Sequence, residues 1–254
     1  TIIGTTDKEY FGSPDDYKVS KESILEVIDT LNKYYGDGNL QYSDVLFAYG
    51  GLRPLVDDPS HESYESSRKY EVHDNLKDGI EGLITVEGGK YTTSRNLAYH
   101  VMELVQKKLH IKLKESITHN NYLSGCEIRD MEQFMIKLHT RYDKHFSFKT
   151  VEYTGRNYGT VCQEIFKLAS ENPELSEVLN NDGEMMAEVY FAIRNEMAKT
   201  LKDIFLRRTG LGTLGHPGNE TIEKVTALAA KMLDWNQEKI KQEKESLENI
   251  FRLP

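Results

Sequence analysis

Apolar side chains recur at three- and four-residue spacings through the second half of the chain, which is the pattern of amphipathic helices. The longest such segment runs from about residue 184 to residue 208, and Gly210 follows it as a helix stop. A methionine and aromatic stripe at this spacing is how a bundle helix buries its apolar face, so these side chains are predicted to be core. The stripes are Met131, Phe134, Met135 and Leu138; Val161, Ile165, Leu168 and Ala169; Met186, Val189, Tyr190, Ile193, Met197, Leu201, Ile204 and Phe205; and Ile222, Val225, Ala229, Met232 and Leu233.

The run from Gln237 to Glu248 alternates in charge and is predicted to be a solvated helical face. The first 90 residues have mixed patterns instead, with a helix beginning near Ser20. Candidate strands are Ile2-Ile3, Val45–Tyr49, Tyr70–Val72 and Leu83–Val86. A polar segment without clear period separates the two halves. The predicted fold is therefore α+β, with a mixed α/β region at 1–112, a linker at 113–125 and an all-α helical bundle domain at 126–254.

Composition excludes several classes of function. The formal net charge of −9 disfavours nucleic acid or an anionic membrane surface as the main partner, because like charges repel at long range. Cys126 and Cys162 lack CxxC spacing and a nearby histidine pair, so they are predicted to be reduced thiols, with no metal site. No apolar run approaches the roughly 20 residues that cross a bilayer. A soluble, cytoplasmic protein is expected.

Two glycine-rich segments have the residues of ligand-binding turns. Gly210–Gly215 matches G-x-G-x-x-G, but no buried strand precedes it and no helix follows directly, so it is predicted to be an inter-helix turn. In Gly82–Arg95 an apolar strand instead passes through Gly88, Gly89 and Lys90 into a helix. Glycines admit close approach of a ligand, and a helix N-terminus suits a phosphate or an electron-rich flavin edge. On these residues alone, a tight turn with a solvated lysine remains the simpler interpretation.

Cations upstream of this turn lie at informative spacings. Arg53 lies between Gly50-Gly51 and Pro54, where its planar fork could face a phosphate or hydroxyl oxygen; on these residues alone, pairing with Asp57 or Asp58 is the better interpretation. Arg68 follows in the same stretch. His73 could be considered as a general base, but Asp74 follows it directly, and a surface pair between the two residues is equally consistent with the sequence.

These segments together resemble the FAD-dependent glycerol-3-phosphate dehydrogenases and their oxidase relatives over nearly the whole chain. The segments that carry the resemblance are Thr1–Asp7, Phe47–Asp58, Ser66–Tyr70, Gly82–Arg95, Tyr153–Gly159, Pro173–Leu175, Ala187–Tyr190, Arg194–Ala198 and Leu206–Gly212. These enzymes begin with a Rossmann-type region for the ADP part of FAD, so the resemblance implies that this chain is a C-terminal part, whose partner is a missing N-terminal FAD-binding segment.

The resemblance also implies the reaction and its residues. Sn-glycerol 3-phosphate would be oxidised to dihydroxyacetone phosphate, with quinone or oxygen as the electron acceptor and possible peripheral attachment to the inner face of the cytoplasmic membrane. Arg53 would orient the substrate as the catalytic residue, and Arg68 would hold its phosphate. Lys90 would contact both substrate and flavin. The FAD-binding residues would be Gly88, Gly89, Lys90, Tyr91, Thr92 and Thr93.

Two other functions remain open. One is a non-catalytic helical module with a phosphate-binding appendage. The other is a different flavin amine or hydroxy-acid oxidase, because carboxylate substrates also recruit arginines. By itself, the 254-residue chain is expected to lack firm FAD binding and turnover.

Overall fold

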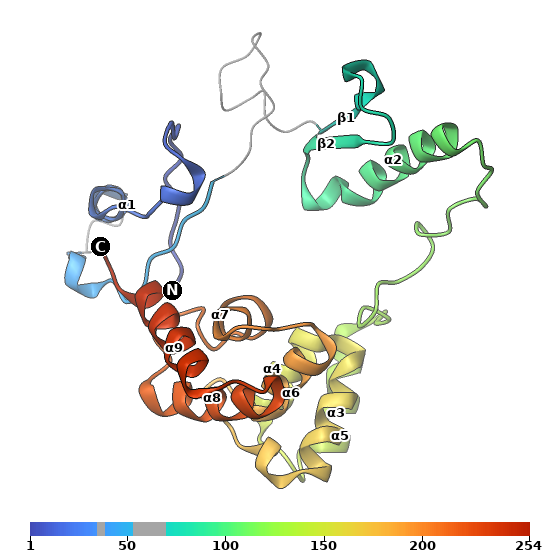
Figure 1. Cartoon of the computed structure of the whole chain (residues 1–254). Helices are drawn as coiled ribbons and strands as arrows, with labels where there is room; N and C mark the ends of the chain where they lie inside the picture. The colour runs from blue at the N-terminus through green and yellow to red at the C-terminus, as the bar shows by residue number, and fades with distance from the viewer. Residues whose placement is uncertain (35–38, 53–69) are drawn as a thin grey trace. The chain divides into compact units, whose positions relative to one another are not determined.

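The computed structural model describes residues 1–34, 39–52 and 70–254 (Figure 1). Two compact units are present: a helical unit, formed by Thr1–Gly50 with Leu123–Pro254, and a small α/β unit, Gly51–Tyr122. The first 50 residues thus group with the helical domain rather than with residues 51–112. The predicted boundaries follow the domains of the resembling enzymes and stay a prediction.

The small unit contains an antiparallel hairpin followed by a helix. Strands β1 (Tyr70–Asp74) and β2 (Ile84–Gly88) pair with Val72 opposite Val86. The short 3₁₀ helix η4 (Asn75–Asp78) begins the connection between them, and η5 (Tyr91–Thr93) leads from β2 into α2 (Ser94–Leu109). The strands predicted at Tyr70–Val72 and Leu83–Val86 are confirmed, as is the helix that follows the glycine turn.

In the first 50 residues, the predicted helix is present and two predicted strands are not. Helix α1 (Lys21–Tyr34) buries Ile24 and Ile28, while η1 (Pro14–Asp16) and η2 (Tyr42–Asp44) are single 3₁₀ turns. Ile2-Ile3 and Val45–Tyr49 have no strand conformation, so these two predictions are wrong. A strand needs a neighbour to take up its backbone hydrogen bonds, and the described residues offer neither segment a ladder.

The predicted helical bundle is confirmed. Its core contains Val151, Ile165, Phe166, Val189 and Phe205, each fully buried. The bundle helices are α3 (Met131–Tyr142), α4 (Phe148–Tyr158), α5 (Cys162–Glu171), α6 (Met186–Asn195), α7 (Leu201–Asp203), α8 (Asn219–Leu233) and α9 (Gln237–Phe251), with short turns η6 (Gly159–Val161), η7 (Pro173–Ser176) and the π-helical η8 (Ile204–Arg208) (Figure 1).

The single long helix predicted at residues 184–208 is wrong, because the chain breaks between α6 and α7. Met197 adopts a left-handed conformation with φ of 62°, and its side chain is largely exposed. Thr200 then caps a new helix: its Oγ1 accepts from Asp203 N–H at 3.0 Å, and Asp203 Oδ2 accepts from Thr200 N–H at 3.0 Å. This reciprocal capping box starts a second helix inside one apolar stripe.

The terminal helix is also less solvated than predicted. Leu247 and Phe251 of α9 are buried, and so is Glu243. The Glu243 carboxylate accepts from Leu201 N–H at 2.9 Å and pairs with Lys239 at 2.6 Å. Residues four apart lie on one helix face, so a highly charged sequence still presents a buried stripe here.

Two smaller predictions, for the cysteines and for Gly210–Gly215, are confirmed. Cys126 is exposed, Cys162 is buried, and both are free thiols; burial raises the pKa of Cys162 to about 12. Gly210–Gly215 forms a turn between η8 and α8. None of the described helices combines the length and the apolar sequence that a bilayer span needs.

Candidate functional site

The predicted flavin-contacting turn joins β2 to α2 in the small unit. Gly88 and Gly89 have φ values of 69° and 97°, a region that side chains with a Cβ rarely adopt. A Cβ at Gly89 would also lie 3.5 Å from Tyr70 Cβ and 3.6 Å from Leu97 Cδ2, an ordinary contact. Glycine is therefore required at Gly89 by backbone conformation rather than by crowding.

Thr93 closes the turn, and Lys90 and Tyr91 face solvent. Lys90 N–H donates to Thr93 Oγ1 at 3.2 Å, and Thr93 N–H donates to Lys90 O at 3.0 Å. Ser94 Oγ donates to Tyr91 O at 2.8 Å. The side chains of Lys90, Tyr91 and Thr92 are exposed. Thr93 thus has a structural role here, whereas the ligand-binding roles of Gly88–Thr93 stay predictions.

Polar contacts that the sequence did not suggest join α2 to β1, one set beside this turn and the other at the opposite end of α2. Asn96 Nδ2 donates to Tyr70 Oη at 2.8 Å, and the Tyr70 and His100 rings lie 6.1 Å apart. Lys108 pairs with Asp74, and the hydrogen bond from Lys108 holds the pKa of Asp74 below its usual value. These contacts join α2 to β1 and so fix the direction in which the N-terminus of α2 points.

Two predicted site residues, Arg53 and Arg68, lie outside the described residues. His73 does form a surface pair, but with Glu71 at 3.2 Å and Glu87 at 3.8 Å rather than with Asp74. Glu71 lies two residues before His73 on β1 and Glu87 lies on the paired strand β2, so the three side chains are neighbours on one face of the hairpin.

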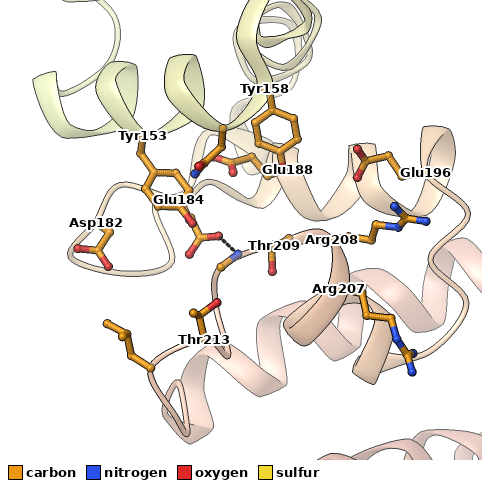
Figure 2. A pocket seen from close by; sticks show the side chains of 13 residues that line it. Tyr153, Tyr158, Asp182, Glu184, Glu188, Glu196, Arg207, Arg208, Thr209 and Thr213 are labelled. Atoms are coloured by element: carbon orange, nitrogen blue, oxygen red, sulfur yellow. Dashed lines mark hydrogen bonds between the residues drawn. The ribbon is translucent and has the colours of Figure 1, made fainter. Parts of the chain in front are cut away.

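A pocket of about 520 Å³ lies in the helical unit (Figure 2). Its walls come from the C-terminal end of α4, the segment 182–196 and the segment 207–214. Glu184 bridges two of these: Oε1 accepts from Gly210 N–H at 2.6 Å, and Oε2 accepts from Asn180 Nδ2 at 2.6 Å. A Cβ at Gly210 would lie 2.1 Å from Tyr153 Oη, so any other residue here would require the Tyr153 side chain to move.

Buried carboxyl groups dominate this pocket. Burial, and then the neighbouring Glu184, raise the pKa of Glu188 to about 8. Burial also raises the pKa values of Glu184 and Glu196, and those of the Tyr153 and Tyr158 hydroxyls. The sequence did contain a signal for this pocket: Glu184 and Glu188 lie four residues apart inside an apolar stripe. The prediction of a core helix did not take these two glutamates into account.

The fold places this chain in a class of proteins that combine an all-α domain with a mixed α/β region. In that region a strand leads through a paired-glycine turn into a helix. Residues 116–240 match the family described as the C-terminal domain of alpha-glycerophosphate oxidase, and this part of the chain belongs to that family. The resemblance seen in the sequence is therefore confirmed.

Named relatives agree with this assignment. A glycerol-3-phosphate dehydrogenase of Synechocystis sp. is 30% identical over 242 residues, which make up 93% of this chain and 43% of the relative. A D-erythritol 1-phosphate dehydrogenase of Brucella abortus is 33% identical over 210 residues, which make up 82% of this chain and 41% of that protein.

A solved structure shares the fold. The glycerol-3-phosphate dehydrogenase from Bacillus halodurans, determined by X-ray crystallography as a complex with FAD, matches with a TM-score of 0.79 at 22% identity. The match covers 97% of this chain and 47% of that one. The chain thus spans less than half the length of the relatives it matches, and it corresponds to their C-terminal portion.

Proposed function

We propose that this chain is the C-terminal part of an FAD-dependent glycerol-3-phosphate dehydrogenase, which oxidises sn-glycerol 3-phosphate to dihydroxyacetone phosphate. The observation that carries the proposal is the turn at Gly88–Thr93 in a chain of this family. The turn fits a flavin edge, because two glycines without Cβ atoms precede a helix N-terminus and an exposed lysine. Bound FAD would accept a hydride from the C2 carbon of the substrate.

Each candidate site residue then has a role in binding or orienting the flavin and the substrate. The N-terminus of α2 and the Lys90 ammonium would place positive charge where the ring becomes electron-rich. Arg68 would hold the dianionic phosphate, and Arg53 would orient the reacting carbon. Thr93 keeps the turn closed through three hydrogen bonds with the Lys90 backbone, two of them made by its hydroxyl.

A longer polyol phosphate is a second candidate for the substrate. The relative of Brucella abortus is named for D-erythritol 1-phosphate, a longer polyol phosphate. An arginine that binds a phosphate does so regardless of the length of the attached polyol, so Arg68 suits both substrates. The electron acceptor is proposed to be quinone or oxygen, with peripheral attachment to the inner face of the cytoplasmic membrane in the quinone case.

Anaerobic flavin reduction tests the proposal. The protein is purified in the longest form that its gene encodes, and the visible absorbance of its flavin is followed after addition of glycerol 3-phosphate or erythritol 1-phosphate. Bleaching by glycerol 3-phosphate is expected. If only erythritol 1-phosphate bleaches the flavin, erythritol 1-phosphate becomes the assigned substrate. If neither compound bleaches it, the proposed reaction is contradicted. A protein that retains no flavin would favour the non-catalytic helical module.

A further inference from the structure

The pocket in the helical unit contains a buried carboxylate oxygen that the proposed oxidation does not use. Glu188 is 1% exposed. Its Oε1 accepts from Met185 N–H at 3.2 Å and from Thr154 Oγ1 at 3.1 Å. Its Oε2 is buried and makes no hydrogen bond of good geometry with the described residues, although the Tyr158 hydroxyl lies near enough to lower the pKa of Glu188. Buried polar atoms are nearly always hydrogen-bonded, so an unpaired one in a pocket wall points to a ligand.

Two neighbouring groups share this property. Tyr158 Oη and Glu196 Oε2 are also buried without a hydrogen-bond partner in the described parts of the chain, and both residues line the same pocket. Figure 2 shows Tyr158 beside Glu188, with Glu196 further along the same wall. The pocket therefore presents three oxygen atoms that can accept hydrogen bonds from one small molecule.

The charges around these oxygens favour a cation. Asp182, Glu184, Glu188 and Glu196 line the pocket on the acidic side, while Arg207 and Arg208 are its cations. Arg207 already pairs with Asp203, and Arg208 faces Glu196, where it opposes the rise in pKa that burial causes. Glu184 is held by Gly210 N–H and Asn180, and no cation among the described residues acts on the pKa of Glu188.

We propose that this pocket binds a small organic cation through a primary ammonium group, which donates hydrogen bonds to Glu188 Oε2 and Tyr158 Oη. The described residues contain no group of three side chains suited to a metal ion, which disfavours a metal here. An anion would find only two cations in the lining, Arg207 and Arg208, and Arg207 is already paired with Asp203. A neutral polyol could use the same oxygens without any ionised carboxylate, so it is the alternative that the test must exclude.

Binding of a cation requires the ionised form of Glu188, and the proton it carries must leave. In the free protein the carboxyl is mostly protonated below pH 8, since its pKa is about 8. Binding converts the carboxylic acid and the ammonium ion into a carboxylate–ammonium pair and one proton released to solvent. Affinity should therefore rise about tenfold for each pH unit up to pH 8 and then level off.

Isothermal titration calorimetry of the full chain tests this with 1,4-diaminobutane as the cation and 1,4-butanediol as its neutral match. Titrations at pH 7 in phosphate and in PIPES, which differ in heat of ionisation, give the number of protons released. Binding of the diamine with release of close to one proton is expected, with no binding of the diol. Equal binding of both compounds, binding without proton release, or no binding of the diamine would overturn the proposal.

Two variants assign the effect to these residues. Glu188→Gln keeps the shape and the acceptor for Met185 N–H but removes the charge, so diamine binding should fall at least tenfold and proton release should disappear. Tyr158→Phe removes one hydroxyl and should weaken binding several-fold. Glu174→Gln, at an exposed glutamate of η7, is the control and should bind like the unmodified chain. Unchanged binding in Glu188→Gln would contradict the assignment, and if that variant does not fold, the comparison of diamine with diol decides.

Discussion

Single residues connect backbone conformation to the proposed chemistry most directly at Gly89. Its φ of 97° lies where L-residues are strained, and its position precedes the exposed Lys90. A residue with a Cβ would hold this conformation between the hairpin end and the start of α2 only at a cost in free energy. The sequence predicted this turn correctly because paired glycines, a strand pattern and a helix pattern are all local signals.

Replacing Gly89 with Ala should destabilise the turn by about 1 kcal/mol or more, since the positive φ is retained at a cost. The longest form that the gene encodes, which we propose binds FAD, should then lose flavin on dialysis, as measured by the ratio of flavin to protein absorbance. Gly82→Ala is the matched control: φ is 83° there, but no heavy atom lies within 4 Å of the added Cβ and the site is away from the turn. Equal flavin loss in both variants would argue against a flavin-binding role for Gly89.

Arg68→Ala should raise KM for glycerol 3-phosphate by about 10- to 100-fold, because a charge-assisted contact is worth about 1.5–3 kcal/mol. Steady-state kinetics with a dye acceptor measure the effect, and kcat should change less than KM. Lys69→Ala removes the adjacent cation and serves as the control. An unchanged KM in Arg68→Ala would remove Arg68 from the phosphate site.

At the scale of helices and strands, the errors of prediction have separate physical causes. Val45–Tyr49 has strand-forming residues, but whether a segment forms a strand depends on a neighbour that local sequence does not specify. The break between α6 and α7 was visible as Thr200-x-x-Asp203, a capping pattern inside an apolar stripe. The pocket residues were missed because segments 153–158, 182–196 and 207–214 meet only in the folded chain.

Thr200→Ala should therefore cost about 0.5–2 kcal/mol, the usual range for loss of an N-cap. Urea unfolding followed by circular dichroism measures the change. Lys202→Ala, at an exposed position in the same turn, should leave the unfolding midpoint nearly unchanged. A midpoint for Thr200→Ala equal to that of the control would show that α7 starts without help from this cap.

For the whole molecule, pH should act on stability through the buried carboxyl group of Glu188. Its folded pKa of about 8 lies above the ordinary value of 4.5, so the folded state binds the proton more tightly than the unfolded state. Between about pH 4.5 and pH 8 the unfolded state loses this proton first, and stability falls as pH rises. The contribution is about 1.4 kcal/mol per pH unit within that window.

Urea unfolding at several pH values between 5 and 8 tests this sign. The difference in unfolding free energy between the unmodified chain and Glu188→Gln should change steadily with pH, at a slope of order 1 kcal/mol per unit. Glu174→Gln should show a constant difference. A pH-independent difference for Glu188→Gln would mean that Glu188 is ionised throughout, and it would also weaken the expectation of proton release in the titration.

The helical unit is joined at its two ends by residues far apart in the chain. Tyr42 Oη donates to Pro254 O across 212 residues, and the Phe47 and Phe251 rings lie 5.5 Å apart. During translation, Phe251 and Pro254, the partners of Phe47 and Tyr42, are synthesised about 200 residues after them. Residues 42–47 must therefore wait, without their packing surface, until residue 254 has emerged, and chaperones can bind them during that interval.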